Sequence, residues 1–208
     1  MSSKKKIFGC VPSVIDGTEN IYEGNDKIVL PDSYSYLTYL PPVINQGSRP
    51  ICVPCSVSAY VNYAINSKQA RNGIDNGIDL NMLFTGDKEG MAVKDCLSNL
   101  KRTGSTTNEG TFYIDNYARI GNIDALKTAI VANGPCIGAI GVYNSLISDF
   151  WTPTSGNFEG GHAISIVGYD KDGFIIRNSW GRSYGKEGYW HIPYEDTNLF
   201  YELWTIIK

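Results

Sequence analysis

The 208-residue sequence has few charged residues and almost no excess of one sign. Lys and Arg number 18 against 21 Asp and Glu, which gives a formal net charge of −3. Without a basic face, the chain lacks the electrostatic footprint of a nucleic-acid-binding protein. It also lacks any apolar run near the roughly 18 residues that a membrane helix needs. We therefore expect neither nucleic acid nor a membrane as a partner, and composition leaves the oligomeric state open.

Histidine and cysteine are also scarce. There are two histidines, His162 and His191, and five cysteines, an odd number that cannot all pair. The cysteines are too sparse for a disulfide scaffold, so we expect reduced thiols and a cytoplasmic or virion-associated protein in a reducing compartment. Secretion is not expected, because Pro12 and Ser13 interrupt the apolar stretch that follows the N-terminal lysines.

Helical periodicity dominates the first half of the chain and strand-like runs dominate the second. Apolar spacing predicts helices over 52–67, 91–102 and 123–133, the last capped by Asn122. Residues 68–90 are rich in Asn and Gly and are expected to form a loop. Short apolar runs bounded by turn residues predict strands over 136–142, 162–169, 174–177, 188–192 and 201–207. This order indicates an α+β fold with two unlike lobes.

The first candidate for chemistry is Cys52, which stands where the first predicted helix begins. Unpaired N–H groups and partial positive charge at a helix N-terminus stabilise a thiolate. The same N–H groups can bind an oxyanion that forms on an attacked carbonyl. Gln46 lies six residues upstream across a tight turn and could add a side-chain N–H to that site.

A second candidate lies on the strands of the other half. His162 follows two glycines at the start of a strand, and Asn178 ends the next strand after the turn 170–173. Antiparallel pairing of these strands would bring Asn178 to His162. Asn178 could then orient the imidazole towards the thiol, in the scheme of nucleophile, base and orienting residue.

Together these motifs resemble the papain family of cysteine peptidases. The order is Gln-Gly-Ser before Cys52, then Gly-His-Ala around His162, then Asn-Ser-Trp-Gly from Asn178. The resemblance implies a two-lobe fold, with Cys52 heading a helix of the helical lobe and His162 and Asn178 on an antiparallel sheet or barrel lobe. It also implies polypeptide substrates, hydrolysis through an acyl-enzyme thioester, and no metal or organic cofactor.

The resemblance carries further roles residue by residue. Gln46 and the Cys52 backbone N–H would form the oxyanion hole, and Trp180 would cover the site. Gly90 and Gly161 would bind the substrate backbone. The peptidase domain would span 31–208, with a helical lobe over about 45–115 and a sheet lobe over about 116–208. Residues 1–30 would be an N-terminal arm or a short pro-segment.

Departures from the family pattern keep other functions open. Arg49, Pro50 and Ile51 replace the usual residues before the nucleophile, which favours considering a catalytically silent binding or structural module. Cys52 and Cys55 are spaced as in thiol-disulfide oxidoreductases, although no βαβ pattern surrounds them. A zinc site lacks a second ligand pair at familiar spacing. A transferase that passes the acyl group to an amine would use the same residues.

Overall fold

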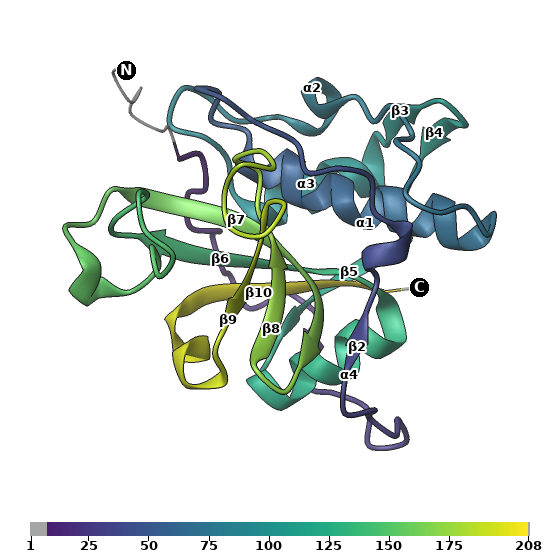
Figure 1. The fold of residues 1–208 in the computed structure, drawn as a ribbon. Coiled ribbons are helices and arrows are strands. Elements are labelled where there is room, and N and C mark those ends of the chain that lie inside the picture. The colour runs from purple at the N-terminus through teal and green to yellow at the C-terminus, as the bar shows by residue number, and fades with distance from the viewer. Residues whose placement is uncertain (1–7, 208) are drawn as a thin grey trace.

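The computed structural model describes residues 8–207, in which a helical layer packs against one large sheet (Figure 1). The helices are α1 (Cys52–Lys68), α2 (Leu80–Leu83), α3 (Val93–Arg102) and α4 (Ile123–Asn133). The strands are β1 (Ile21–Tyr22), β2 (Tyr34–Ser35), β3 (Ser105–Thr107), β4 (Gly110–Phe112), β5 (Asn116–Ile120), β6 (Cys136–Val142), β7 (Gly160–Asp170), β8 (Gly173–Arg177), β9 (Tyr189–Ile192) and β10 (Phe200–Ile207). Short 3-10 turns lie at Leu37–Tyr39, Pro153–Ser155 and Tyr194–Leu199.

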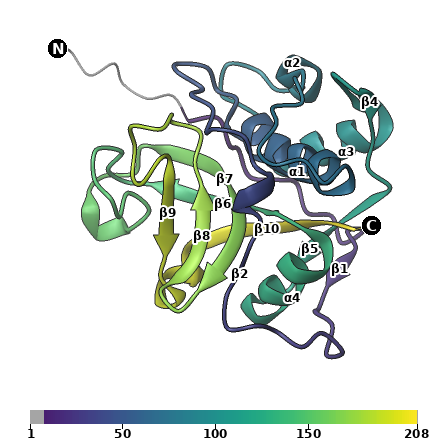
Figure 2. The ribbon, with the colours of Figure 1, turned by 45° about the vertical axis from the view of Figure 1, so that its right-hand side comes forward.

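The large sheet runs in the order β1-β5-β10-β6-β7-β8-β9, and β2 pairs with β7. All these pairs are antiparallel except β1 with β5. Helices α1 to α3 and the β3–β4 hairpin lie above it, while α4 covers β5 and β10 at the other end (Figure 2). The predicted α+β fold with a helical part and an antiparallel sheet is confirmed.

Helix α1 is buried on almost every side because it lies between α3 and β7. A helix surrounded in this way needs apolar or small residues on all its faces. The hydroxyl of Ser165 on β7 donates to the Ser56 carbonyl at 2.9 Å and ties the helix to the sheet. Pro54 falls in the first helical turn, where its missing N–H has no intrahelical partner to lose.

The three predicted helices and five predicted strands are confirmed, with ends shifted by at most two residues. Asn122 caps α4 as expected, accepting from the Ala125 N–H at 2.8 Å. The expectation that 68–90 is all loop is wrong, because Asp79 caps the single turn α2. Within residues 8–207, no helix is both long and apolar enough to cross a membrane.

Candidate active site

Cys52 is the first residue of α1, and its side chain is fully buried. The preceding turn is closed by two hydrogen bonds: the Arg49 N–H donates to the Gln46 carbonyl at 3.2 Å, and Gln46 Nε2 donates to the Arg49 carbonyl at 3.0 Å. From the sheet, the Ala163 N–H donates to Cys52 Sγ at 3.4 Å. The sulfur therefore lies at the junction of α1 and β7, next to the residue that follows His162.

His162 and Asn178 come together because their strands are neighbours in the sheet. His162 lies near the start of β7, and Asn178 directly follows β8. The distance from His162 Nε2 to Asn178 Oδ1 is 2.8 Å, and the Ser179 N–H donates to the same oxygen at 2.7 Å. Two donors on one oxygen fix the orientation of the amide. Nε2 therefore carries the proton, and Nδ1 is the basic nitrogen of the neutral ring.

Trp180 covers this pair. Its ring stacks on the His162 ring with centroids 4.7 Å apart and planes 25° apart. Phe150 also packs against the indole, at 4.8 Å between centroids. His162, Asn178 and Trp180 are all buried. The aromatic cover lowers the local polarity around the imidazole and strengthens its hydrogen bond to Asn178.

Gln46 is buried beside the same residues. Its Oε1 accepts from the Ser179 hydroxyl at 2.5 Å, and its backbone N–H donates to the Ser179 carbonyl at 2.8 Å. Two residues after Ser179, the Gly181 N–H donates to the Ile44 carbonyl at 3.0 Å. The loop before α1 and the loop after β8 are thus joined, which fixes the Gln46 amide in the turn that precedes Cys52.

The N-terminal arm, defined here as residues 8–19, crosses this site. The Cys10 N–H donates to the Gly161 carbonyl at 3.1 Å, and the Met91 N–H donates to the Gly9 carbonyl at 3.0 Å. A Cβ on Gly90 would lie 2.1 Å from the Gly9 oxygen, and a Cβ on Gly161 would lie 2.1 Å from the Cys10 oxygen. Both glycines that were assigned to substrate binding therefore contact a peptide backbone, which here is the chain's own.

The same arm is anchored at its far end by polar groups from both halves of the molecule. Ser13 donates from its N–H and its hydroxyl to Glu202 on β10, at 2.5 and 2.6 Å. Its hydroxyl also accepts from the Lys94 N–H of α3 at 3.2 Å. The Lys94 ammonium pairs with Glu19 and lies 3.6 Å from Asp16. Nothing in the sequence of the arm signalled this placement.

Comparison with known proteins decides the family. Residues 51–201, which contain Cys52, His162 and Asn178, match the papain family of cysteine proteases. The chain belongs to that family. The solved structure of xylellain, a cysteine protease from Xylella fastidiosa, superimposes with a TM-score of 0.83 at 22% identity, covering 99% of this chain and 98% of that one. Procathepsin B S9 from Trypanosoma congolense gives 0.80 at 13% identity, over 97% and 86% of the two chains.

Sequence relatives within the papain family match over shorter stretches. The cathepsin B-like protein CP3 of Giardia intestinalis is 41% identical over 76 residues, which is 33% of this chain and 25% of the relative. An uncharacterised peptidase C1-like protein of Acanthamoeba polyphaga mimivirus is 33% identical over 97 residues, or 40% and 31% of the two chains. The chain thus spans a quarter to a third of the length of these curated relatives.

Two opposing effects act on the pKa of the Cys52 thiol. Burial raises this pKa to about 11, while the N–H groups of Ala163, Gly9 and Val53 act to lower it. Desolvation of the thiolate is the larger of the two effects. Burial likewise raises the pKa of Cys55 to about 12. Burial thus favours the neutral thiol at both positions.

Proposed function

We propose that this chain is a cysteine endopeptidase that hydrolyses polypeptides with Cys52 as nucleophile, His162 as base and Asn178 as orienting residue. The observation that carries the proposal is the 2.8 Å contact between His162 Nε2 and Asn178 Oδ1. It leaves Nδ1 as the basic nitrogen, on the residue whose neighbour Ala163 touches the sulfur. A purely structural histidine would not need this tautomer to be fixed beside a buried thiol.

In the proposed reaction, Nδ1 takes the proton of the Cys52 thiol, and the thiolate attacks the carbonyl carbon of the scissile bond. The oxyanion accepts from the Cys52 N–H and from Gln46 Nε2, which has two hydrogens and gives one of them to the Arg49 carbonyl. The imidazolium then protonates the leaving amine, and a thioester remains. Water, deprotonated by His162, attacks the thioester and releases the acid.

The arm is proposed to act as a pro-segment that keeps the site closed. The Gly9 N–H donates to Cys52 Sγ. The Gly9 carbonyl oxygen accepts from the Met91 N–H at 3.0 Å. Substrate needs the same backbone groups, so the arm must leave before a peptide can bind.

An epoxide inhibitor of thiol proteases tests the proposal on the full chain. The arm is displaced with Gly9→Val, because a Cβ at this position would lie 2.2 Å from the Pro50 carbonyl oxygen. We expect one adduct on Cys52, located by peptide mass, with no adduct in Gly9→Val/His162→Ala and no change in Gly9→Val/Cys55→Ala. Absence of an adduct from a Gly9→Val protein that is folded by circular dichroism would contradict the proposal and favour a silent module.

Product masses separate hydrolysis from its alternatives. Incubation of the Gly9→Val protein with a defined peptide mixture should yield free acids and free amines. Joined peptides would indicate acyl transfer to an amine instead of water. Reduction of a test disulfide without peptide cleavage would favour the oxidoreductase, against which the burial of Cys55 and its pKa of about 12 argue.

A further inference from the structure

A second cysteine stands on the same turn of α1 as the nucleophile. Cys52 is the first residue of the helix, Cys55 follows three positions later, and both side chains are buried. In an α-helix, residues three apart lie on one face with their Cα atoms about 5 Å apart. A disulfide needs roughly 4.4 to 6.8 Å between its Cα atoms. The first turn of α1 therefore provides the Cα spacing that a disulfide between these two thiols requires.

The surroundings of Cys55 favour a reaction with Cys52 over one with a reagent in solution. Burial and, to a smaller extent, the neighbouring Cys52 raise the pKa of Cys55 to about 12, while Arg49 and Arg177 act to lower it. The effect of Cys52 shows that the two sulfur atoms lie within electrostatic range, and the two cations favour the thiolate, which is the form that attacks another sulfur. Because Cys55 is only 5% exposed, its reaction partner has to be a group inside the protein.

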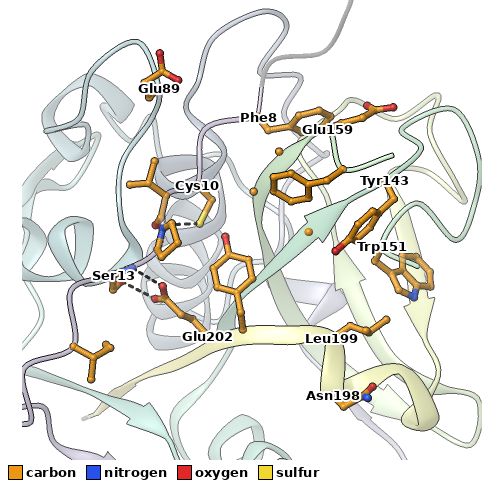
Figure 3. Close-up of a pocket in the computed structure, with 18 of the residues that line it drawn as sticks. Phe8, Cys10, Ser13, Glu89, Tyr143, Trp151, Glu159, Asn198, Leu199 and Glu202 are labelled. Carbon is orange, nitrogen blue, oxygen red and sulfur yellow. Dashed lines mark hydrogen bonds between the residues drawn. The ribbon is translucent and has the colours of Figure 1, made fainter. Parts of the chain in front are cut away.

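Another thiol near Cys52 is Cys10, which belongs to the arm. Burial and then Cys52 raise the pKa of Cys10. Cys10 lines a cavity of about 1140 Å³ beside the arm, across from Tyr143 and Trp151 (Figure 3). When the arm leaves, Cys10 leaves with it, whereas Cys55 stays on the helical turn of Cys52. Cys55 is therefore the thiol that remains beside Cys52 once the nucleophile is uncovered.

We propose that Cys55 is a resolving thiol for Cys52, and that the two form a reversible disulfide which protects the uncovered nucleophile from irreversible oxidation. The oxidant is a hydroperoxide and the reductant is a dithiol. The proposal rests on the proposed peptidase function, because it requires that Cys52 become a reactive thiolate in the open site. It does not make the protein an oxidoreductase for external disulfides, since Cys55 is closed to solvent.

The chemistry takes two steps. First, the Cys52 thiolate attacks one oxygen of the hydroperoxide and the O–O bond breaks. Cys52 becomes a sulfenic acid, and the other oxygen leaves with its electron pair and is protonated. Second, the sulfur of Cys55 attacks the sulfur of Cys52 and the S–O bond breaks. The departing hydroxide takes the Cys55 proton and forms water. The two cysteines together lose two electrons, which reduce the peroxide, and a dithiol later returns two electrons and restores both thiols.

Hydrogen peroxide treatment of the full-length Gly9→Val protein tests this pairing by mass. Free thiols are alkylated before tryptic digestion. We expect the peptide that carries Cys52 and Cys55 to be about 2 Da lighter than the unmodified peptide, because two hydrogen atoms are lost, and to regain its thiols with dithiothreitol. Lys27 separates this peptide from Cys10, so a bond to Cys10 would join two peptides instead. Peptidase activity should be lost as the bond forms and recovered with dithiothreitol.

Replacement of Cys55 should make the oxidation permanent. In Gly9→Val/Cys55→Ala, Cys52 should pass on to the sulfinic and sulfonic acids, which add about 32 and 48 Da and which dithiothreitol does not reverse. Activity should then fail to recover. Gly9→Val/Cys136→Ala is the matched control, because it removes a buried thiol of β6 and not of α1, and recovery should be unchanged.

The outcomes separate this proposal from the peptidase assignment. In folded Gly9→Val protein that forms the epoxide adduct, three results overturn the pairing and leave the peptidase function standing: over-oxidised Cys52 beside a free Cys55, a disulfide from Cys52 to Cys10, or no oxidation of Cys52. A Cys52–Cys55 disulfide in a protein that forms no epoxide adduct supports the pairing and overturns the peptidase function. Because the bond is mapped before Cys55 is changed, the test holds even if Gly9→Val/Cys55→Ala fails to fold.

Discussion

Two parts of the molecule meet at Cys52 but are held in different ways. One is the N-terminal arm, and the other is the part of the sheet that carries His162, Asn178 and Trp180, which we call the wall. On the wall, His162 and Asn178 stand on paired strands, are buried, and are covered by the stacked ring of Trp180. The arm pairs with Gly161 and Met91 through single hydrogen bonds and buries Cys10 in the core, and its far end is held by polar contacts of Ser13 and by the Lys94 ion pairs. The wall is built from paired strands, whereas much of the arm is held by polar contacts.

This difference indicates separate roles. Asn178 is hydrogen-bonded to His162 and Trp180 stacks on its ring, whereas the ring of Phe8 in the arm makes an edge contact at 6.0 Å between centroids. Loss of the arm should therefore leave the triad geometry intact. The proposed role of the arm is to limit access to Cys52 and the solvation of its sulfur.

Loss of the base should have the largest effect on the wall. In the Gly9→Val background, His162→Ala should lower kcat/KM by roughly 10⁴-fold, as expected when one member of a cooperating triad is removed. The measurement is hydrolysis of a fluorogenic peptide. His191→Ala is the matched control, because the other histidine is exposed and pairs with Asp170 at 2.8 Å. A comparable loss in both variants would show that histidine replacement acts through folding.

Displacement of the arm should give the next largest effect. Burial raises the pKa of Cys52 from its ordinary 9.0 to about 11, so uncovering the sulfur should raise the thiolate fraction at pH 7 by about 100-fold. Gly9→Val should raise peptidase activity by at least this factor, because substrate also gains entry. Val14→Ala changes an exposed residue of the same arm and should have no effect. Equal activity of wild type and Gly9→Val would refute closure by the arm.

Much of the wall could be predicted from the sequence, because its signals are local. Cys52 follows a turn and begins an apolar helix, and the short turn 170–173 makes β7 and β8 neighbours. Such patterns fix which residues meet. The strands β1 to β5 were missed. The first four have only two or three residues with polar members and carry no periodic signal, and β5 has Asn116 and Arg119 among its five residues.

The position of the arm could not be predicted from local sequence patterns. Its contacts depend on tertiary partners about 80 to 190 residues away, such as Met91, Gly161 and Glu202. Burial, which raises the pKa of Cys52, depends on the tertiary fold and could not be predicted from the position of this residue at a helix N-terminus. The one local hint was the small residues Gly90 and Gly161, which leave room for a passing backbone.

The Ser13 contacts should have a smaller effect than Gly9. Ser13→Ala removes a hydroxyl that donates to Glu202 and accepts from the Lys94 N–H. At about 1 kcal/mol for each of these two net hydrogen bonds, the population ratio of docked to undocked arm should fall about 30-fold. Amide exchange of residues 8–15, read by mass spectrometry, should accelerate by this factor, and Val14→Ala should leave it unchanged. Unchanged amide exchange in Ser13→Ala would show that the contacts around Gly9, and not those of Ser13, hold the arm in place.

The weakest expected effect is that of mild acid on the arm. Hydrogen bonds from Thr18 lower the pKa of Asp16 to about 2, and the Lys94 hydrogen bond lowers the pKa of Glu19. Carboxyl groups with depressed pKa values stabilise the docked arm above their ordinary pKa, and this contribution is lost only as the pH falls through the depressed values. Amide exchange in the arm, corrected for its intrinsic rate, should therefore stay nearly constant from pH 8 to about pH 5. Release within that range would contradict the role of this anchor.

The pH dependence of Cys52 alkylation by iodoacetamide tests the central claim most directly, namely that a finished triad lies under a removable arm. Wild type should react with an apparent pKa near 11, the value that burial produces. Gly9→Val should react at much lower pH, and Gly9→Val/His162→Ala should lose most of that shift, because His162 stabilises the thiolate once the sulfur is uncovered. Superimposable profiles for wild type and Gly9→Val would contradict the account.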